Sequence, residues 1–169
     1  MEEWRSVLEK MTVKGHALFP TQKTMSNIAY NLQYLEYLQQ TVKELSLSSV
    51  LLTQTYKSYI IVAVSVIESI LFHLVQCHGS RKKMLFKILK YIEKESLLGV
   101  ENPFCDDLDR FRKLRNKVHL CEFKDGLSTD YIEFGNKEYT EIRSMLYDIA
   151  TYDIFNLDDD AKQSFRFLT

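Results

Sequence analysis

The chain has 169 residues, 46% of them hydrophobic and 27% charged, a balance that is typical of one folded globular domain spanning residues 1–169 and that excludes a disordered tail or a membrane protein. Its formal net charge of −1 excludes a protein that binds nucleic acid or an acidic membrane with its whole surface, because such proteins carry a large basic excess. Any contact with RNA must therefore be local.

The N-terminal part predicts a short helix and then a long one. A helix over residues 2–11 precedes an irregular connection over residues 15–23, which contains Pro20. Over residues 26–45, apolar side chains recur every three or four positions, as one face of a helix requires. On that long helix, Tyr30, Tyr34 and Tyr37 form a second stripe. They could stack on bases, but tyrosines at a helix or subunit contact are commoner, and we treat them as packing residues.

Residues 53–77 predict a second long helix, which is apolar on nearly every side and ends before Gly79, a residue typical of a helix C-terminus. Its most hydrophobic stretch is interrupted by polar side chains such as Glu68 and His73, whereas a membrane span needs about 20 mainly apolar residues. We therefore predict a buried central helix and no membrane contact. Such a helix must be enclosed by its neighbours or by another copy of the chain.

Residues 80–95 predict a third helix, with Met84 and four other apolar residues facing inward and the lysines forming a solvated outer face rather than a track for RNA. A fourth helix begins after Pro103, because the following Asp106 and Asp107 suit a first helical turn. It contains the basic segment described below.

The C-terminal part begins with residues 130–136, which predict a short strand and turn in a small β-hairpin. Residues 139–152 predict the last long helix, and the tail after Asn156 adds a further turn or two. Four or five helices joined by short connections amount to an all-α antiparallel bundle.

Residues 110–119 are densely basic and end in a histidine. At about 100° per residue, Arg115 and His119 lie about 40° apart on a helix, with Arg112 beside them and Asn116 bordering the same face. RNA cleavage without metal needs proton transfer, which histidine performs, and cations for the phosphate, which arginine supplies. Asn116 could orient the phosphate or the ribose. A surface of ion pairs is the alternative that this spacing leaves open.

The same segment contains further candidates for binding and support. Lys113, Lys117 and Arg110 are expected to contact RNA, because they extend the run of positive charge. Phe111 and Leu114 occupy the neighbouring face and are expected to hold the helix against the core.

Residues 114–120, Leu-Arg-Asn-Lys-Val-His-Leu, together with residues 66–71 of the central helix, resemble the HEPN superfamily (higher eukaryotes and prokaryotes nucleotide-binding domain). The similarity covers about residues 26–155. HEPN proteins are helical bundles, and many are metal-independent endoribonucleases of toxin, phage-defence or CRISPR systems. Their signature is an Arg, commonly followed by Asn, with four to six residues before a His.

The resemblance implies that the motif histidine is His119. The arginine is ambiguous: Arg115 precedes Asn116 but leaves only three intervening residues, whereas Arg112 leaves six and lacks the Asn. We favour Arg115 as the motif arginine, with Arg112 as support. This departure matters because inactive members of the family act as dimerisation or ligand-binding modules, which is the alternative function.

The resemblance further implies a homodimer, in which two copies of the motif form one composite cleft. A nucleotide or a partner protein such as a cognate antitoxin is the ligand expected for the alternative function. Glu68 lies midway along the predicted central helix, where an unpaired carboxylate is costly. We hypothesise that Glu68 orients Arg115 or His119. A partly exposed Glu68, or one bonded to serine, is an equally good alternative.

Three cysteines, Cys77, Cys105 and Cys121, form neither an even disulfide set nor a Cys-x-x-Cys pair, so we expect reduced thiols and a cytoplasmic protein. The first residues do not resemble a signal peptide. The Cys and His spacings match no zinc module, and the chain has no Gly-rich phosphate loop. We therefore expect neither a metal nor a cofactor.

Overall fold

The computed structural model describes residues 2–99, 104–116 and 133–169. Helices dominate this part of the chain, so the predicted all-α fold is confirmed. The α-helices are α1 (Glu2–Lys10), α2 (Gln22–Glu44), α3 (Ser49–Cys77), α4 (Leu85–Lys94), α5 (Phe104–Asn116), α7 (Asn136–Ala150) and α8 (Asp159–Ser164). Two strands, β1 (Thr12–Val13) and β2 (His16–Ala17), form a hairpin, and the 3-10 helices η1 (Asp153–Phe155) and η2 (Phe165–Leu168) flank α8.

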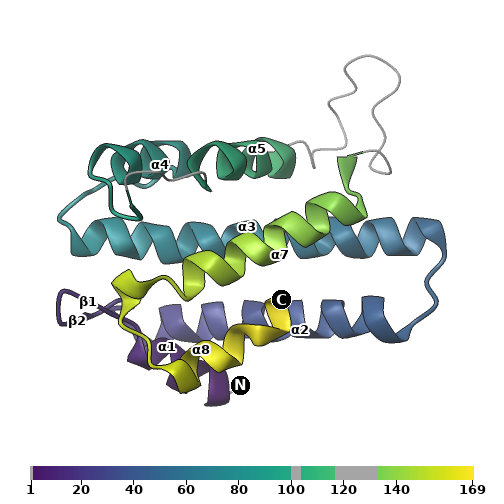
Figure 1. The fold of residues 1–169 in the computed structure, drawn as a ribbon, viewed down its shortest axis with the longest axis horizontal. Coiled ribbons are helices and arrows are strands. Elements are labelled where there is room, and N and C mark those ends of the chain that lie inside the picture. The colour runs from purple at the N-terminus through teal and green to yellow at the C-terminus, as the bar shows by residue number, and fades with distance from the viewer. Residues whose placement is uncertain (1, 100–103, 117–132) are drawn as a thin grey trace.

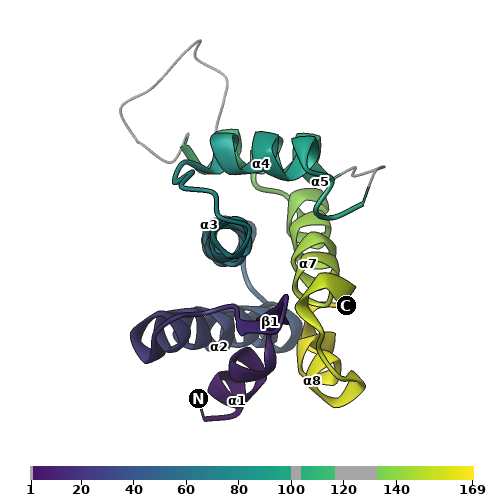
Figure 2. The same cartoon turned by 90° about the vertical axis from the view of Figure 1, so that its left-hand side faces the viewer.

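The central helix of the bundle is α3, which packs against α2, α4, α5 and α7. Figure 1 shows α4 and α5 in a layer above α3, and α2 in a layer below it, while α7 passes alongside. In the view of Figure 2, α1 and α8 lie beside α2 at the bottom of the molecule. Along α3, Tyr59, Ile60, Ala63, Ile67 and Ile70 are fully buried, as predicted for an enclosed helix.

By length and composition, α3 is also the one helix among the described residues that could cross a membrane. In its most apolar window, 56% of the residues are buried inside the bundle. This burial is typical of the core helix of a folded domain, whose apolar surface is covered by neighbouring helices rather than by lipid.

The predicted hairpin over residues 130–136 has a different outcome. Residues 130–132 lie outside the described residues, and residues 133–136 contain no strand. A hairpin forms instead between β1 and β2, where the sequence predicted an irregular connection. Its two turn residues, Lys14 and Gly15, have φ angles of 52° and 77°. Positive φ at both positions is what a tight two-residue hairpin turn requires.

The start of the third helix was predicted wrongly. Residues 80–84 are not helical, and α4 begins at Leu85, so Arg81, Lys82 and Lys83 precede the helix. Three adjacent cations are unfavourable in a first helical turn, because the helix dipole places positive charge there. Met84, predicted to face inward, is exposed as a consequence.

The tyrosine stripe of α2 was predicted to pack at a helix or a subunit contact, and within one chain it makes no such helix contact. Tyr30, Tyr34 and Tyr37 are all exposed and do not pack into the core. The rings of Tyr34 and Tyr37 stack on each other instead, with centroids 6.1 Å apart. Within one chain, these side chains form a surface of partly stacked aromatic rings.

Candidate functional site

The basic segment lies on α5, which is firmly held by the core. Leu108 and Phe111 are fully buried and Leu114 is nearly so, on a helix that packs against both α3 and α4. Asp106 and Asp107 occupy the first turn, where negative charge is favourable. The polar side chains of α5 are therefore presented by a supported helix, as the sequence predicted.

The side chain of Arg115 turns toward α3 and pairs with Glu68. Nη1 of the guanidinium donates a hydrogen bond to Oε2 of the carboxylate, and the two charges form an ion pair. The side chains are only 23% and 28% exposed. Glu68 thus has the cation that its position on α3 requires, and it fixes the direction of the Arg115 guanidinium.

Arg112 takes a different partner and does not join Glu68. Its Nε donates to Oδ1 of Asp109 at 2.7 Å, and Nζ of Lys113 lies 2.8 Å from Oδ2 of the same carboxylate. Hydrogen bonds from Arg112 and Lys113 lower the pKa of Asp109. Asp109 therefore binds one catalytic candidate, Arg112, and one candidate RNA contact, Lys113, an arrangement that its spacing of three and four residues from them would have predicted.

Arg110 lies on the side of α5 that faces α7. It pairs with Glu141, and its guanidinium lies 4.5 Å from the ring centroid of Phe111. About 140° separates Arg110 from Arg115 around the helix. Arg110 therefore belongs to another face than the proposed catalytic arginine.

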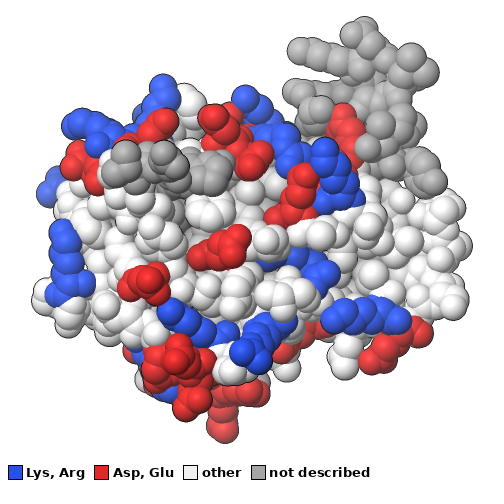
Figure 3. Space-filling view, viewed as in Figure 1, with Lys and Arg blue, Asp and Glu red and all other residues white. Residues whose placement is uncertain are grey.

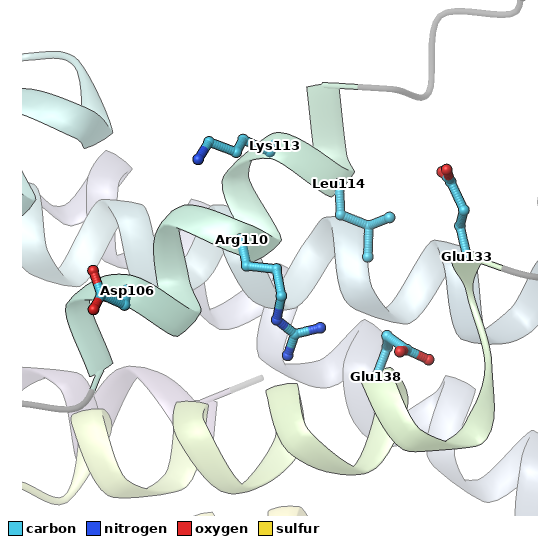
Figure 4. Close-up of a pocket in the computed structure, with 6 residues that line it drawn as sticks. All are labelled: Asp106, Arg110, Lys113, Leu114, Glu133 and Glu138. Atoms are coloured by element: carbon cyan, nitrogen blue, oxygen red, sulfur yellow. The ribbon is translucent and has the colours of Figure 1, made fainter. Parts of the chain in front are cut away.

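A pocket opens on this α7 side of α5 (Figure 4). Its lining residues are Asp106, Arg110, Lys113, Leu114, Glu133 and Glu138. Three carboxylates oppose two cations in this lining, so its net charge is −1 (2 − 3). A phosphate is disfavoured in such a pocket. The pocket does not bring Arg110 and Lys113 together with Arg115.

The remaining candidates lie at or beyond the described end of α5. Asn116 is exposed, directly after Arg115. Lys117 and His119 lie outside the described residues. The structure thus shows Arg115 held by Glu68 beside an exposed Asn116, and the position of the histidine remains a prediction.

Sequence reasoning overlooked one group beside the basic segment. The exposed ring of Phe86, on α4, has Nζ of Lys90 at 4.4 Å and the guanidinium carbon of Arg112 at 5.7 Å from its centroid. The spacing of four residues between Phe86 and Lys90 was a usable signal. The contact between Phe86 and Arg112 could not be predicted from spacing, because the two residues lie on different helices.

Other titratable side chains are removed from water in ways that suit a core. His73 is buried between the rings of Phe19 and Phe72, and burial lowers its pKa. Burial raises the pKa of the Cys105 thiol to about 11, with smaller contributions from Glu93 and Asp106. Within residues 2–99, 104–116 and 133–169, no group of three His, Cys, Asp or Glu side chains could hold a metal ion.

Comparisons of the chain with protein-family models, with curated proteins and with solved structures find no match.

Proposed function

We propose that the protein is a metal-independent endoribonuclease of HEPN type that acts as a cytoplasmic homodimer. In this proposal, Arg115 holds the scissile phosphate, with Arg112 as support. His119 transfers protons, and Asn116 orients the phosphate or ribose. The observation that supports it most is the ion pair between Arg115 and Glu68, because it orients a guanidinium on a supported helix next to an exposed amide.

The proposed reaction is transfer of the phosphate to the neighbouring ribose oxygen. The 2′-hydroxyl loses its proton to a neutral imidazole and attacks phosphorus, while the bond from phosphorus to the 5′-oxygen breaks. A protonated imidazole gives the leaving oxygen its proton, so the products are a 2′,3′-cyclic phosphate and a 5′-hydroxyl. Two copies of His119 at a composite cleft would supply the base and the acid. Arg115 would stabilise the charge that builds on the phosphate.

The homodimer is supported by apolar surface that one chain leaves uncovered. Besides the three tyrosines of α2, Leu45, Val50 and Leu51 are exposed at the junction of α2 and α3. Residues 45–56 contain no charged side chain, and the right-hand end of the face in Figure 3 is correspondingly free of charge. A surface of this kind is typical of a contact between subunits.

A second candidate function is a non-catalytic module that binds a nucleotide or a partner protein such as an antitoxin. One observation favours it: both candidate arginines are already paired with carboxylates, Arg115 with Glu68 and Arg112 with Asp109. Each pair reduces the positive charge offered to a phosphate. A toxin or phage-defence role belongs to the first candidate, because it requires cleavage.

The test is incubation of the purified protein with labelled RNA in the presence of a chelator. We expect fragments that end in a 2′,3′-cyclic phosphate, and a loss of about 10²- to 10⁴-fold in rate for His119→Ala, the range typical of general acid–base groups. The matched control is His16→Ala, which removes an exposed histidine from the hairpin. Absence of cleavage, or equal cleavage by His119→Ala, would rule out the nuclease and leave the binding module.

A further inference from the structure

An exposed aromatic ring on α4 has cations from two helices near it. Phe86, in the first turn of α4, remains 43% exposed although Lys90 and Arg112 both lie over its ring. Lys90 comes from the same helix, one turn later, and Arg112 comes from α5. We call these three side chains, Phe86, Lys90 and Arg112, the Phe86 platform.

The chain around the platform is strongly basic. Residues 80–95 contain six Lys and Arg and two Glu, a net charge of +4 (6 − 2) in a protein whose overall charge is −1. Three of these cations, Arg81, Lys82 and Lys83, are exposed in the non-helical segment before α4. Figure 3 shows basic side chains projecting from the end of the molecule where α4 lies, with acidic side chains among them. The local charge is therefore suited to a polyanion.

The exposed ring of Phe86 is not explained by a lysine face that only contacts water, because an exposed phenylalanine forgoes the free energy of burial. Single-stranded RNA could contact both the ring and the surrounding cations. Its bases stack on aromatic rings regardless of sequence, and its phosphates pair with neighbouring cations. Arg112 also lies only three residues before Arg115, about 4.5 Å along the axis of α5.

We propose that the Phe86 platform binds single-stranded RNA, with one base on the exposed part of the Phe86 ring and an adjoining phosphate on Lys90. Arg112, whose charge is partly offset by Asp109, borders the ring on the side of α5. The strand then continues along α5 toward Arg115. This inference rests on the proposed function, because it supplies the binding track for the substrate that Arg115 and His119 would cleave.

An anionic membrane is the competing partner for a basic segment with exposed apolar groups. Membrane-binding helices insert a whole apolar face into the interface. On α4, Leu85, Ile88, Leu89 and Ile92 are all buried in the bundle, which leaves Phe86 exposed on the helix and Met84 exposed just before it. This is too little apolar surface for insertion, so the structure favours RNA.

The experiment measures fluorescence anisotropy of a labelled single-stranded oligoribonucleotide of adenosine and uridine, with His119→Ala protein in chelator so that nothing is cut. Phe86→Ala should weaken binding by about 5- to 150-fold, the range expected for loss of one stacked base. Phe86→Trp should bind at least as tightly as Phe86. The matched control for packing is Phe86→Leu, which keeps apolar bulk without a ring and should bind as weakly as Phe86→Ala.

The contribution of charge is measured separately. Lys90→Ala should reduce the slope of log affinity against log salt by about 0.7, the value for one phosphate contact on a single strand. Lys43→Ala, which removes an exposed lysine from α2, should leave both affinity and slope unchanged. Circular dichroism of each variant checks that the fold is retained.

Three results would overturn the platform. In the first, Phe86→Ala and Phe86→Leu bind RNA as tightly as the protein with Phe86. In the second, Phe86→Ala loses affinity equally for inorganic polyphosphate, which has no bases. In the third, the protein binds vesicles of phosphatidylserine and not RNA. If RNA binding depends on Phe86 but the unmodified protein does not cleave RNA, only the nuclease proposal is contradicted. If the protein cleaves RNA but binding does not depend on Phe86, only the platform is contradicted.

Discussion

The carboxylate of Glu68, midway along the central helix, pairs with the guanidinium of Arg115, which lies 47 residues later on α5. The pair joins the core of the bundle to the segment for which we propose catalysis. Because both side chains are less than one-third exposed, the loss of either one leaves a charge that water screens only in part.

Glu68→Ala should therefore lower both stability and cleavage. We expect the free energy of unfolding to fall by about 1–3 kcal/mol, the range for a hydrogen bond to a charged group. Cleavage should fall by about 10- to 100-fold, because the guanidinium is no longer oriented. Urea denaturation and a chelator-resistant RNA assay measure the two effects. The matched control is Glu141→Ala, which removes the more exposed partner of Arg110 and should cost at most about 1 kcal/mol.

A double-mutant cycle with Arg115→Ala distinguishes the pair from general damage to the core. If Glu68 acts through Arg115, the two substitutions together should lower cleavage little more than Arg115→Ala alone. Fully additive losses would show that Glu68 and Arg115 act independently, which contradicts the positioning role.

Asp109 predicts a pH dependence of stability. Its pKa in the folded chain is lowered by hydrogen bonds from Arg112 and Lys113, so its contribution is present above the unfolded pKa of about 3.9 and is lost as pH falls through the folded value. Asp109→Asn should therefore be less stable than the unmodified protein at pH 6, and the difference should vanish in stronger acid. Urea denaturation at a series of pH values measures this difference. A constant difference across the series is incompatible with this assignment.

Cys105 should react slowly with alkylating agents. Burial raises its pKa to about 11 from an ordinary value of 9.0, which reduces the thiolate at neutral pH by about 100-fold, and the thiolate is the reactive form. In a Cys77→Ser and Cys121→Ser background, iodoacetamide should label Cys105 far more slowly in buffer than in urea. Equal rates in the two solvents would mean that the thiol is accessible in the folded protein.

The uncovered apolar surface predicts self-association. Tyr37→Asp and Leu51→Asp should each convert the dimer into a monomer in light scattering after size exclusion, because a buried unpaired carboxylate is costly at an interface. Glu9→Lys, a charge change on the exposed face of α1, is the control and should remain dimeric. A protein that is already monomeric before substitution contradicts both the dimer and the composite cleft.

The helices were predictable from sequence where their apolar periodicity was strong. Residues 139–152 and 26–45 predicted α7 and α2 within a few residues, because burial of one face determines both. The predicted starts of α2 and α4 were wrong, because hydrogen bonds and charges near a helix N-terminus determine where the helix begins. Thr21 starts α2 four residues early by accepting a hydrogen bond from the backbone N–H of Thr24 at 3.2 Å. At the other helix, Arg81, Lys82 and Lys83 delay the start of α4 until Leu85, because their positive charges are unfavourable at the positive end of the helix dipole.

The candidate site was predictable only in part. A carboxylate on the central helix favours a cation partner, and this argument named Arg115 or His119 for Glu68, with a partly exposed Glu68 as an equal alternative. The structure shows the pair with Arg115 on a Glu68 side chain that is 28% exposed. The spacing of three residues on one helix could have indicated the pair between Arg112 and Asp109, but it could not show that Arg112 also lies near the ring of Phe86 on another helix. Contacts between helices, such as those of Arg112 with Phe86 and of Arg115 with Glu68, depend on packing that the sequence of one helix does not contain.

The helix that supplies Glu68 is also the most deeply enclosed element of the bundle, with fully buried Ile67 directly before it and Ile70 two residues after it. A cavity created beside either isoleucine should therefore shift Glu68 and change the orientation of the Arg115 guanidinium. If Arg115 is catalytic as we propose, substitutions in this interior should reduce cleavage before they cause measurable unfolding.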